Sequence, residues 1–121
     1  MPKRPRILCV DDDEETRLIL TQLFELAGYE IKTVVSTAEA LELSHKESFN
    51  LYILDQWFLK GSGLGLCRAI REFDPHTPIV IYSGAAFESD RDEALQAGAN
   101  AFVAKPYIDK LLEAIKRLLD F

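Results

Sequence analysis

The stretch RILCVDDDEET, residues 6–16, passes directly from an apolar run into five consecutive acids. The unbroken apolar run at residues 7–10 predicts a short strand that is buried on both faces. Asp13 is suited to cap a helix, and residues 14–15 would lie in its first turn, where the helix dipole favours negative charge. Residues 11–12 remain at the end of the strand, so their role depends on what the fold brings beside them.

The same alternation of strand and helix continues along the chain. Further apolar runs occupy residues 30–35, 51–54, 79–82 and 101–103, and the expected helices span residues 15–27, 37–45, 64–73, 88–97 and 108–119. Regular alternation of this kind predicts an α/β fold, a doubly wound five-stranded parallel sheet with helices on both faces.

Length and composition restrict the class of protein. A chain of 121 residues, 48% of them hydrophobic, predicts one domain over residues 1–121. There is no apolar run of about 18 residues and no secretory signal, so we expect a cytoplasmic protein without a membrane segment. The net charge of −6 argues against direct nucleic-acid binding. Lys3, Arg4 and Arg6 are interpreted as a solvated flank.

Polar side chains follow four of the five expected strands. Asp11 and Asp12 follow the first strand, Asp55 the third, Ser83 the fourth and Lys105 the fifth. Because the carboxyl ends of parallel strands meet at one edge of a sheet, these groups are expected to converge there. The edge would then carry three carboxylates, a hydroxyl and an ammonium.

This set of groups suits phosphoryl chemistry. Three neighbouring carboxylates repel one another, and a hard dication such as Mg²⁺ relieves that repulsion. Asp55 lies among apolar residues, where an acid must be paired or bind a metal, and a carboxylate can act as a nucleophile toward phosphorus. Lys105 and Ser83 would then neutralise and hydrogen-bond the phosphoryl oxygens.

Four motifs resemble those of one known family. VDDD at residues 10–13, YILD at 52–55, YSG at 82–84 and GANAFVAKPY at 98–107 occur in the order and spacing of bacterial response regulator receiver domains. The chain is similar to these two-component signalling domains, and to the chemotaxis regulators among them, over essentially its whole length. The resemblance implies the flavodoxin-like strand order 2-1-3-4-5 and a signalling domain rather than an enzyme.

The resemblance also implies a role for each site residue. Asp55 would accept a phosphoryl group from the phosphohistidine of a histidine kinase or phosphotransfer protein. Asp12, Asp55 and the backbone carbonyl of Trp57 would bind Mg²⁺, with Asp11 acting through water. No other cofactor is implied.

The remaining family positions concern the response to phosphorylation. Ser83 would bond a phosphoryl oxygen, Lys105 would pair with it, and Ser83 and Phe102 would form the switch. The bond between Lys105 and Pro106 is cis in many relatives. The family implies an output partner on the face formed by the fourth helix, fifth strand and fifth helix, and dimerisation on phosphorylation is possible.

Two departures from the family keep alternatives open. Leu59 stands where relatives usually have proline, and Ser62 stands where an acid often precedes the glycine. One alternative is a pseudo-receiver that docks partners without being phosphorylated. Another is a magnesium-dependent phosphatase or a flavodoxin-like carrier. A phosphatase would need a further acid/base group and a substrate cap, and 121 residues leave no room for a cap. The bulky Trp57 is hypothesised to shield the aspartyl phosphate from water.

Overall fold

A five-stranded parallel sheet with helices on both faces forms the centre of the molecule. The computed structural model describes residues 3–58, 61–84 and 87–120. The elements are β1 (Arg6–Val10), α1 (Glu14–Leu26), β2 (Glu30–Val34), α2 (Thr37–Lys46), β3 (Leu51–Leu54), β4 (Trp57–Phe58), β5 (Gly61–Ser62), α3 (Gly63–Phe73), β6 (Ile79–Ser83), α4 (Glu88–Ala97), β7 (Ala101–Ala104) and α5 (Ile108–Leu119).

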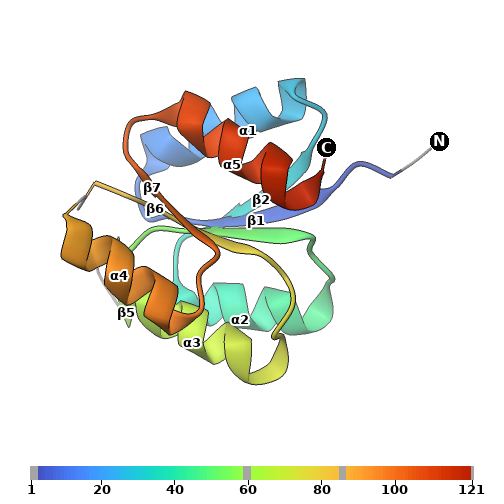
Figure 1. The fold of residues 1–121 in the computed structure, drawn as a ribbon. Helices are drawn as coiled ribbons and strands as arrows, with labels where there is room; N and C mark the ends of the chain where they lie inside the picture. The colour runs from blue at the N-terminus through green and yellow to red at the C-terminus, as the bar shows by residue number, and fades with distance from the viewer. Residues whose placement is uncertain (1–2, 59–60, 85–86, 121) are drawn as a thin grey trace.

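The strand order of the large sheet is β2-β1-β3-β6-β7, and every neighbouring pair is parallel. Counting only these five strands, this is the predicted order 2-1-3-4-5, so the fold prediction is confirmed. Helices α1 and α5 cover one face and α2, α3 and α4 cover the other (Figure 1). Among the described residues, no helix is both long and apolar enough to cross a membrane.

The central strands are apolar throughout because each contributes to two cores. In β1, Ile7 and Cys9 pack with residues of α1 and α5, whereas Leu8 and Val10 pack with residues of α2, α3 and α4. All four side chains are at most 1% exposed. Alternate side chains of a strand point to opposite faces, so a sheet covered on both sides requires an unbroken apolar run.

The five acids after β1 have two different roles, as the sequence predicts: some cap α1 and others lie at the edge of the sheet. Asp13 is the N-cap of α1, and its carboxylate accepts a hydrogen bond from the Thr16 amide at 3.0 Å. Glu14 and Glu15 lie in the first turn of the helix, where the dipole favours them. Asp11 and Asp12 are therefore left for the edge of the sheet.

A small antiparallel hairpin, β4–β5, follows the third strand of the sheet and was not predicted. Its strands have two residues each, with Trp57 opposite Ser62, which is too short to leave a sequence pattern. Ser62 also caps α3 by accepting a hydrogen bond from the Gly65 amide at 3.0 Å. This departure from the family thus has a structural role, while Leu59 lies outside the described residues.

Arg6 is not the solvated residue that the sequence predicts. Its guanidinium pairs with Glu30 on β2 and Glu47 after α2, and it lies 4.9 Å from the centre of the Phe49 ring. Only 28% of its side chain is exposed. The interpretation was wrong for Arg6, because its partners come from distant parts of the chain.

Replacement of Gly63 tests the tight join between β3 and α3. A Cβ at Gly63 would lie 1.8 Å from the backbone oxygen of Asp55, so Gly63→Ala must shift the backbone. We expect a loss of about 1–3 kcal/mol in the free energy of unfolding, measured by urea denaturation. A Cβ at Gly84 would meet nothing within 4 Å, so Gly84→Ala serves as the control. Equal losses in both variants would contradict this account.

Candidate functional site

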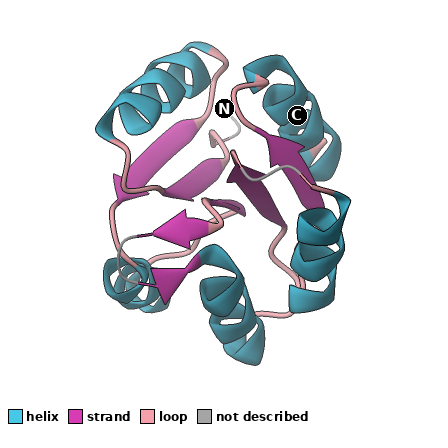
Figure 2. Cartoon of the chain, turned by 90° about the vertical axis from the view of Figure 1, so that its left-hand side faces the viewer, coloured by secondary structure: helices cyan, strands magenta, loops and turns pink. Residues whose placement is uncertain are grey.

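The groups predicted to converge do meet at the carboxyl edge of the sheet, the end of the molecule that faces the viewer in Figure 2. β1 and β3 are neighbours in register, with Val10 beside Leu54, so the residues that follow them lie side by side. β6 and β7 are paired in the same way, with Ser83 beside Ala104. The register of the sheet therefore brings together side chains that are far apart in the sequence.

The acidic cluster consists of Asp11, Asp12 and Asp55. Each offers a carboxylate oxygen, and these oxygens lie within 4.8 Å of one another. Asp11 is only 2% exposed, and the Asp55 side chain is 12% exposed. Carboxylates this close and this poorly hydrated repel one another strongly.

Lys105 is the cation at the centre of this cluster. Its ammonium lies 2.8 Å from Oδ2 of Asp11 and 3.6 Å from Oδ1 of Asp55. Burial acts to lower the pKa of Lys105, but the hydrogen bond to Asp11 and the surrounding carboxylates outweigh it, and the net pKa is raised. Lys105 is therefore a permanently charged group, held closer to Asp11 than to Asp55.

Backbone amides fix the orientation of two carboxylates. Oδ1 of Asp11 accepts a hydrogen bond from the Asp13 amide at 2.9 Å, and Oδ1 of Asp55 accepts one from the Gln56 amide at 2.9 Å. Arg17 of α1 donates to the backbone oxygen of Asp11 at 2.9 Å. These contacts orient the carboxylates toward the shared edge, while the pairing of β1 with β3 sets the distance between their segments.

The charge imbalance appears in the ionisation of Asp55. Burial, followed by the neighbouring charge of Asp11, raises its pKa from 3.8 to about 6, although Lys105 works in the opposite direction. Among the described residues, three carboxylates face one ammonium, so negative charge is in excess. Oxygen donors with excess negative charge are the ligands that a hard dication prefers, so the residues fit Mg²⁺.

The other predicted residues occupy distinct surroundings. Ser83 ends β6 and is 1% exposed, and Phe102 of β7 is 8% exposed within the core cluster that includes α4 residues. Trp57 is 59% exposed in β4. The peptide bond between Lys105 and Pro106 is cis, as the resemblance implies.

Gln56 is a polar residue at this edge that sequence reasoning missed. Its side chain is fully buried, and its amide nitrogen lies 3.5 Å from Oδ1 of Asp90 on α4. The only signal in the sequence is a neutral polar residue between Asp55 and Trp57. That signal does not reveal a buried amide, because its partner is 34 residues away.

Comparison with known families decides the class of protein. The model of the response regulator receiver domain matches residues 7–116. The chain belongs to the response regulator receiver family. The predicted resemblance is therefore confirmed, and the chain is a signalling domain of two-component type.

Curated relatives include the probable transcriptional regulators ycf27 of Galdieria sulphuraria and Guillardia theta. They are 37% and 36% identical to this chain over 112 and 111 residues. The matches cover 93% and 92% of this chain but 44% and 43% of the relatives. The chain thus spans less than half the length of these relatives.

Solved receiver structures have the same fold. The chemotaxis response regulator CheY4 of Vibrio cholerae has a TM-score of 0.90 and 27% identity, covering 96% of this chain and 99% of that one. The response regulator TrrA of Thermotoga maritima, solved in complex with Mg²⁺-BeF, has a TM-score of 0.86 and 32% identity, covering 95% and 99%.

The raised pKa of Asp55 leads to a prediction about stability. A carboxyl whose folded pKa is raised stabilises the fold below its unfolded pKa, and this contribution is lost as pH rises through about 6. In metal-free protein at pH 7.5, Asp55→Asn should therefore raise the free energy of unfolding by about 1–3 kcal/mol. Near pH 4 the gain should shrink toward zero.

Urea denaturation at the two pH values measures this difference. Asp92→Asn removes an exposed carboxylate from α4 and serves as the control for net charge. A destabilised Asp55→Asn variant at pH 7.5, or a gain of equal size at both pH values, would contradict the prediction.

Proposed function

We propose that this receiver domain accepts a phosphoryl group on Asp55 from the phosphohistidine of a histidine kinase or phosphotransfer protein. The observation that carries the proposal is the convergence of Asp55 with Lys105, Asp11 and Asp12 at one edge of the sheet. Each group has a role in transferring phosphorus between an imidazole and a carboxylate. The proposal treats residues 1–121 as one receiver unit.

The proposed reaction is a direct displacement at phosphorus. A carboxylate oxygen of Asp55 attacks the phosphorus atom, the P–N bond to the imidazole breaks, and the imidazole leaves with the bonding electrons. Lys105 pairs with the negative charge on the phosphoryl oxygens, and the Ser83 hydroxyl donates a hydrogen bond to one of them. The ammonium of Lys105 is already 3.6 Å from Asp55, so little movement is needed.

Asp12 and Asp55, with the backbone carbonyl of Trp57, are proposed to hold Mg²⁺, and Asp11 is proposed to act through water. When bound, the ion would offset the charge of the phosphoryl oxygens and of the acidic cluster. Asp11 suits a less direct role, because both of its carboxylate oxygens already accept hydrogen bonds, from the Asp13 amide and from Lys105.

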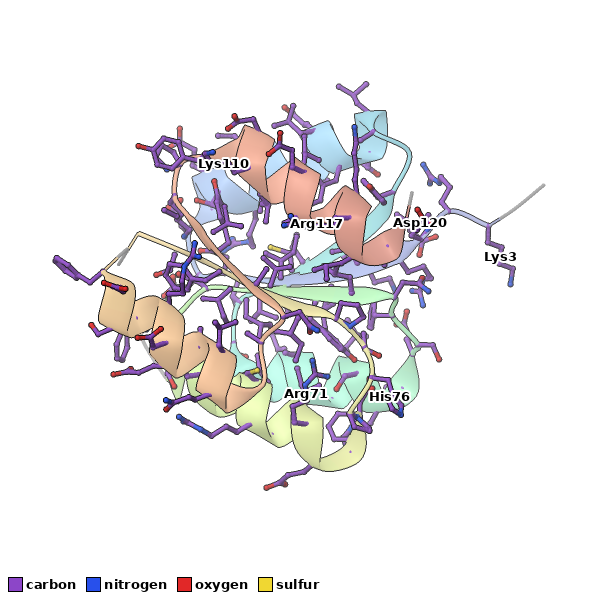
Figure 3. All side chains as sticks on the ribbon, viewed as in Figure 1. Lys3, Arg71, His76, Lys110, Arg117 and Asp120 are labelled. Atoms are coloured by element: carbon purple, nitrogen blue, oxygen red, sulfur yellow. The ribbon has the colours of Figure 1, made fainter. Side chains whose placement is uncertain are left out.

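Phosphorylation is proposed to act on the face formed by α4, β7 and α5. Ser83 and Phe102 would form the switch, since Phe102 lies on β7 and Ser83 ends β6, the strand that pairs with β7. A groove of about 580 Å³ runs along the face and is lined by residues of all three elements, including Lys110 and Arg117, which Figure 3 labels on α5. We propose this face as the site for an output partner, or for dimerisation after phosphorylation.

The pseudo-receiver alternative is not favoured. A docking module that is never phosphorylated has no need for Asp55, Lys105 and the acidic pair to meet at one edge, yet they do so.

A cytoplasmic location is also proposed. Cys9 and Cys67 are both buried free thiols, which agrees with this location, where thiols stay reduced.

Phosphorylation of Asp55 can be tested by intact mass. After incubation with Mg²⁺ and a small acyl-phosphate donor, the protein should gain one phosphoryl group, and Asp55→Asn should gain none. Asp12→Ala should abolish the magnesium-dependent gain, because it removes a proposed ligand. Glu15→Ala is the matched acid control and should keep the gain, at a small cost in stability. An unmodified wild-type protein would refute phosphorylation and support the docking alternative.

Trp57 is expected to slow hydrolysis of the aspartyl phosphate. It lies two residues after Asp55, so loss of the indole should admit water, and Trp57→Ala should speed autodephosphorylation about threefold. The decay of the phosphorylated mass measures this rate. Phe73→Ala, at an exposed aromatic residue that ends α3, is the control. An unchanged or slower decay in Trp57→Ala would show that the indole does not shield the site.

A further inference from the structure

A chain of hydrogen bonds runs from the Asp55 carboxylate to the first turn of α4. The Gln56 amide N–H donates to Oδ1 of Asp55 at 2.9 Å, and the Gln56 side-chain amide donates to Oδ1 of Asp90 at 3.5 Å. The second oxygen of Asp90, Oδ2, accepts from the backbone amide of Phe87, the N-cap of α4, at 3.0 Å. One residue, Gln56, therefore contacts both the proposed phosphoacceptor and the start of a helix.

The burial of Gln56 is costly for the fold. The side chain is 0% exposed, and its Oε1 has no hydrogen-bond partner among residues 3–58, 61–84 and 87–120. Buried amide oxygens are nearly always paired, and an apolar side chain of the same size would avoid the penalty. Within the described ranges, the hydrogen bond that the Gln56 side chain makes is the long one to Asp90. This contact is therefore the feature that distinguishes Gln56 from an apolar residue.

The backbone of Gln56 is held firmly. Its carbonyl accepts a hydrogen bond from the Gly63 amide at 2.8 Å, at the start of α3, where no Cβ can be accommodated. Its amide is bonded to Asp55. A rearrangement of the contact between Gln56 and Asp90 must therefore involve mainly the Gln56 side chain and α4.

The two ends of α4 are held differently. At its C-terminal end, Arg71 of α3 donates to the Gly98 carbonyl at 3.0 Å and also bonds Asn100 at 2.9 Å; Arg71 is labelled in Figure 3. Within the helix only Ala94 and Ala97 are buried. The N-terminal turn contributes no buried side chain, and among the described residues the bond from Gln56 to Asp90 is one of the contacts that hold it.

We propose that Gln56 is a positioning residue that couples the state of Asp55 to the first turn of α4. As a signalling step it rests on the proposed phosphorylation of Asp55, which would change the acceptor of the Gln56 N–H. The change passes through the Gln56 side chain to Asp90 and then to the N-terminus of α4. A shift that brings a donor to the unpaired Oε1 is favoured, because it removes the buried hydrogen-bond deficit.

The coupling can be tested in the unphosphorylated protein by amide hydrogen exchange. The reporters are the amides of Asp90 and Arg91, which bond to the Phe87 carbonyl in the first turn of α4. Gln56→Met keeps the size of the side chain and removes the bond to Asp90, and it should speed exchange of these amides about fivefold. The exchange rate of the Gly98 amide should not change, because Arg71 holds that end of the helix. Gln96→Met makes the same replacement at an exposed site on α4 and should leave the reporters unchanged.

A double-mutant cycle separates coupling from a merely structural role. Asp55→Ala removes the acceptor of the Gln56 N–H and should change exchange of the reporter amides in the wild-type background. In the Gln56→Met background the same substitution should have no effect on them. An equal effect in both backgrounds, no effect in either, or faster exchange throughout α4 in Gln56→Met would overturn the proposal.

The double-mutant cycle tests the role of Gln56, and the mass measurement tests phosphorylation of Asp55, so either proposal can be refuted without the other. A protein that shows the cycle but gains no phosphoryl group would refute phosphorylation of Asp55 and retain the link to α4. A protein that gains the group on Asp55 but shows no cycle would retain the proposed function and refute the role of Gln56.

Discussion

The excess of negative charge at the carboxyl edge is the constraint on which the functional part of this structure depends. Among the described residues, three carboxylates meet one ammonium there, and local backbone amides fix the orientation of Asp11 and Asp55. A fold selected for stability alone would remove one of these acids. The pairing of β1 with β3 instead enforces their contact, so the domain retains a site that favours cations and, with Lys105, can accommodate a phosphoryl group.

Much of this arrangement follows from local sequence because parallel sheets obey simple rules. Strands covered on both faces are continuously apolar, and whatever follows them lies at one edge, which located Asp11, Asp12, Asp55, Ser83 and Lys105 in advance. Other features depend on contacts between distant segments. Examples are the pairing of Arg6 with β2 and α2, the two-residue strands of the hairpin, and the approach of Gln56 to α4. No local pattern encodes these, since each partner is set by the tertiary fold.

The carboxyl edge contacts both layers of helices, but through different residues. On the side of α2, α3 and α4, the core includes Phe102, and Gln56 reaches Asp90. On the side of α1 and α5, the core includes strand side chains such as Ile7 and Ile53, and Arg17 of α1 donates to the Asp11 carbonyl. A change at Asp55 therefore has polar and apolar contacts through which to reach α4.

The position of Trp57 gives the protein a built-in optical probe. It is the one tryptophan of the chain, it lies two residues from Asp55, and its side chain is 59% exposed to solvent. Indole emission depends on local polarity and on nearby charge, and in the unlabelled protein it comes from a residue two positions along the chain from Asp55. A cation held at Asp55, or a change in the charge of that residue, is therefore expected to change this emission, which gives a readout that needs no dye.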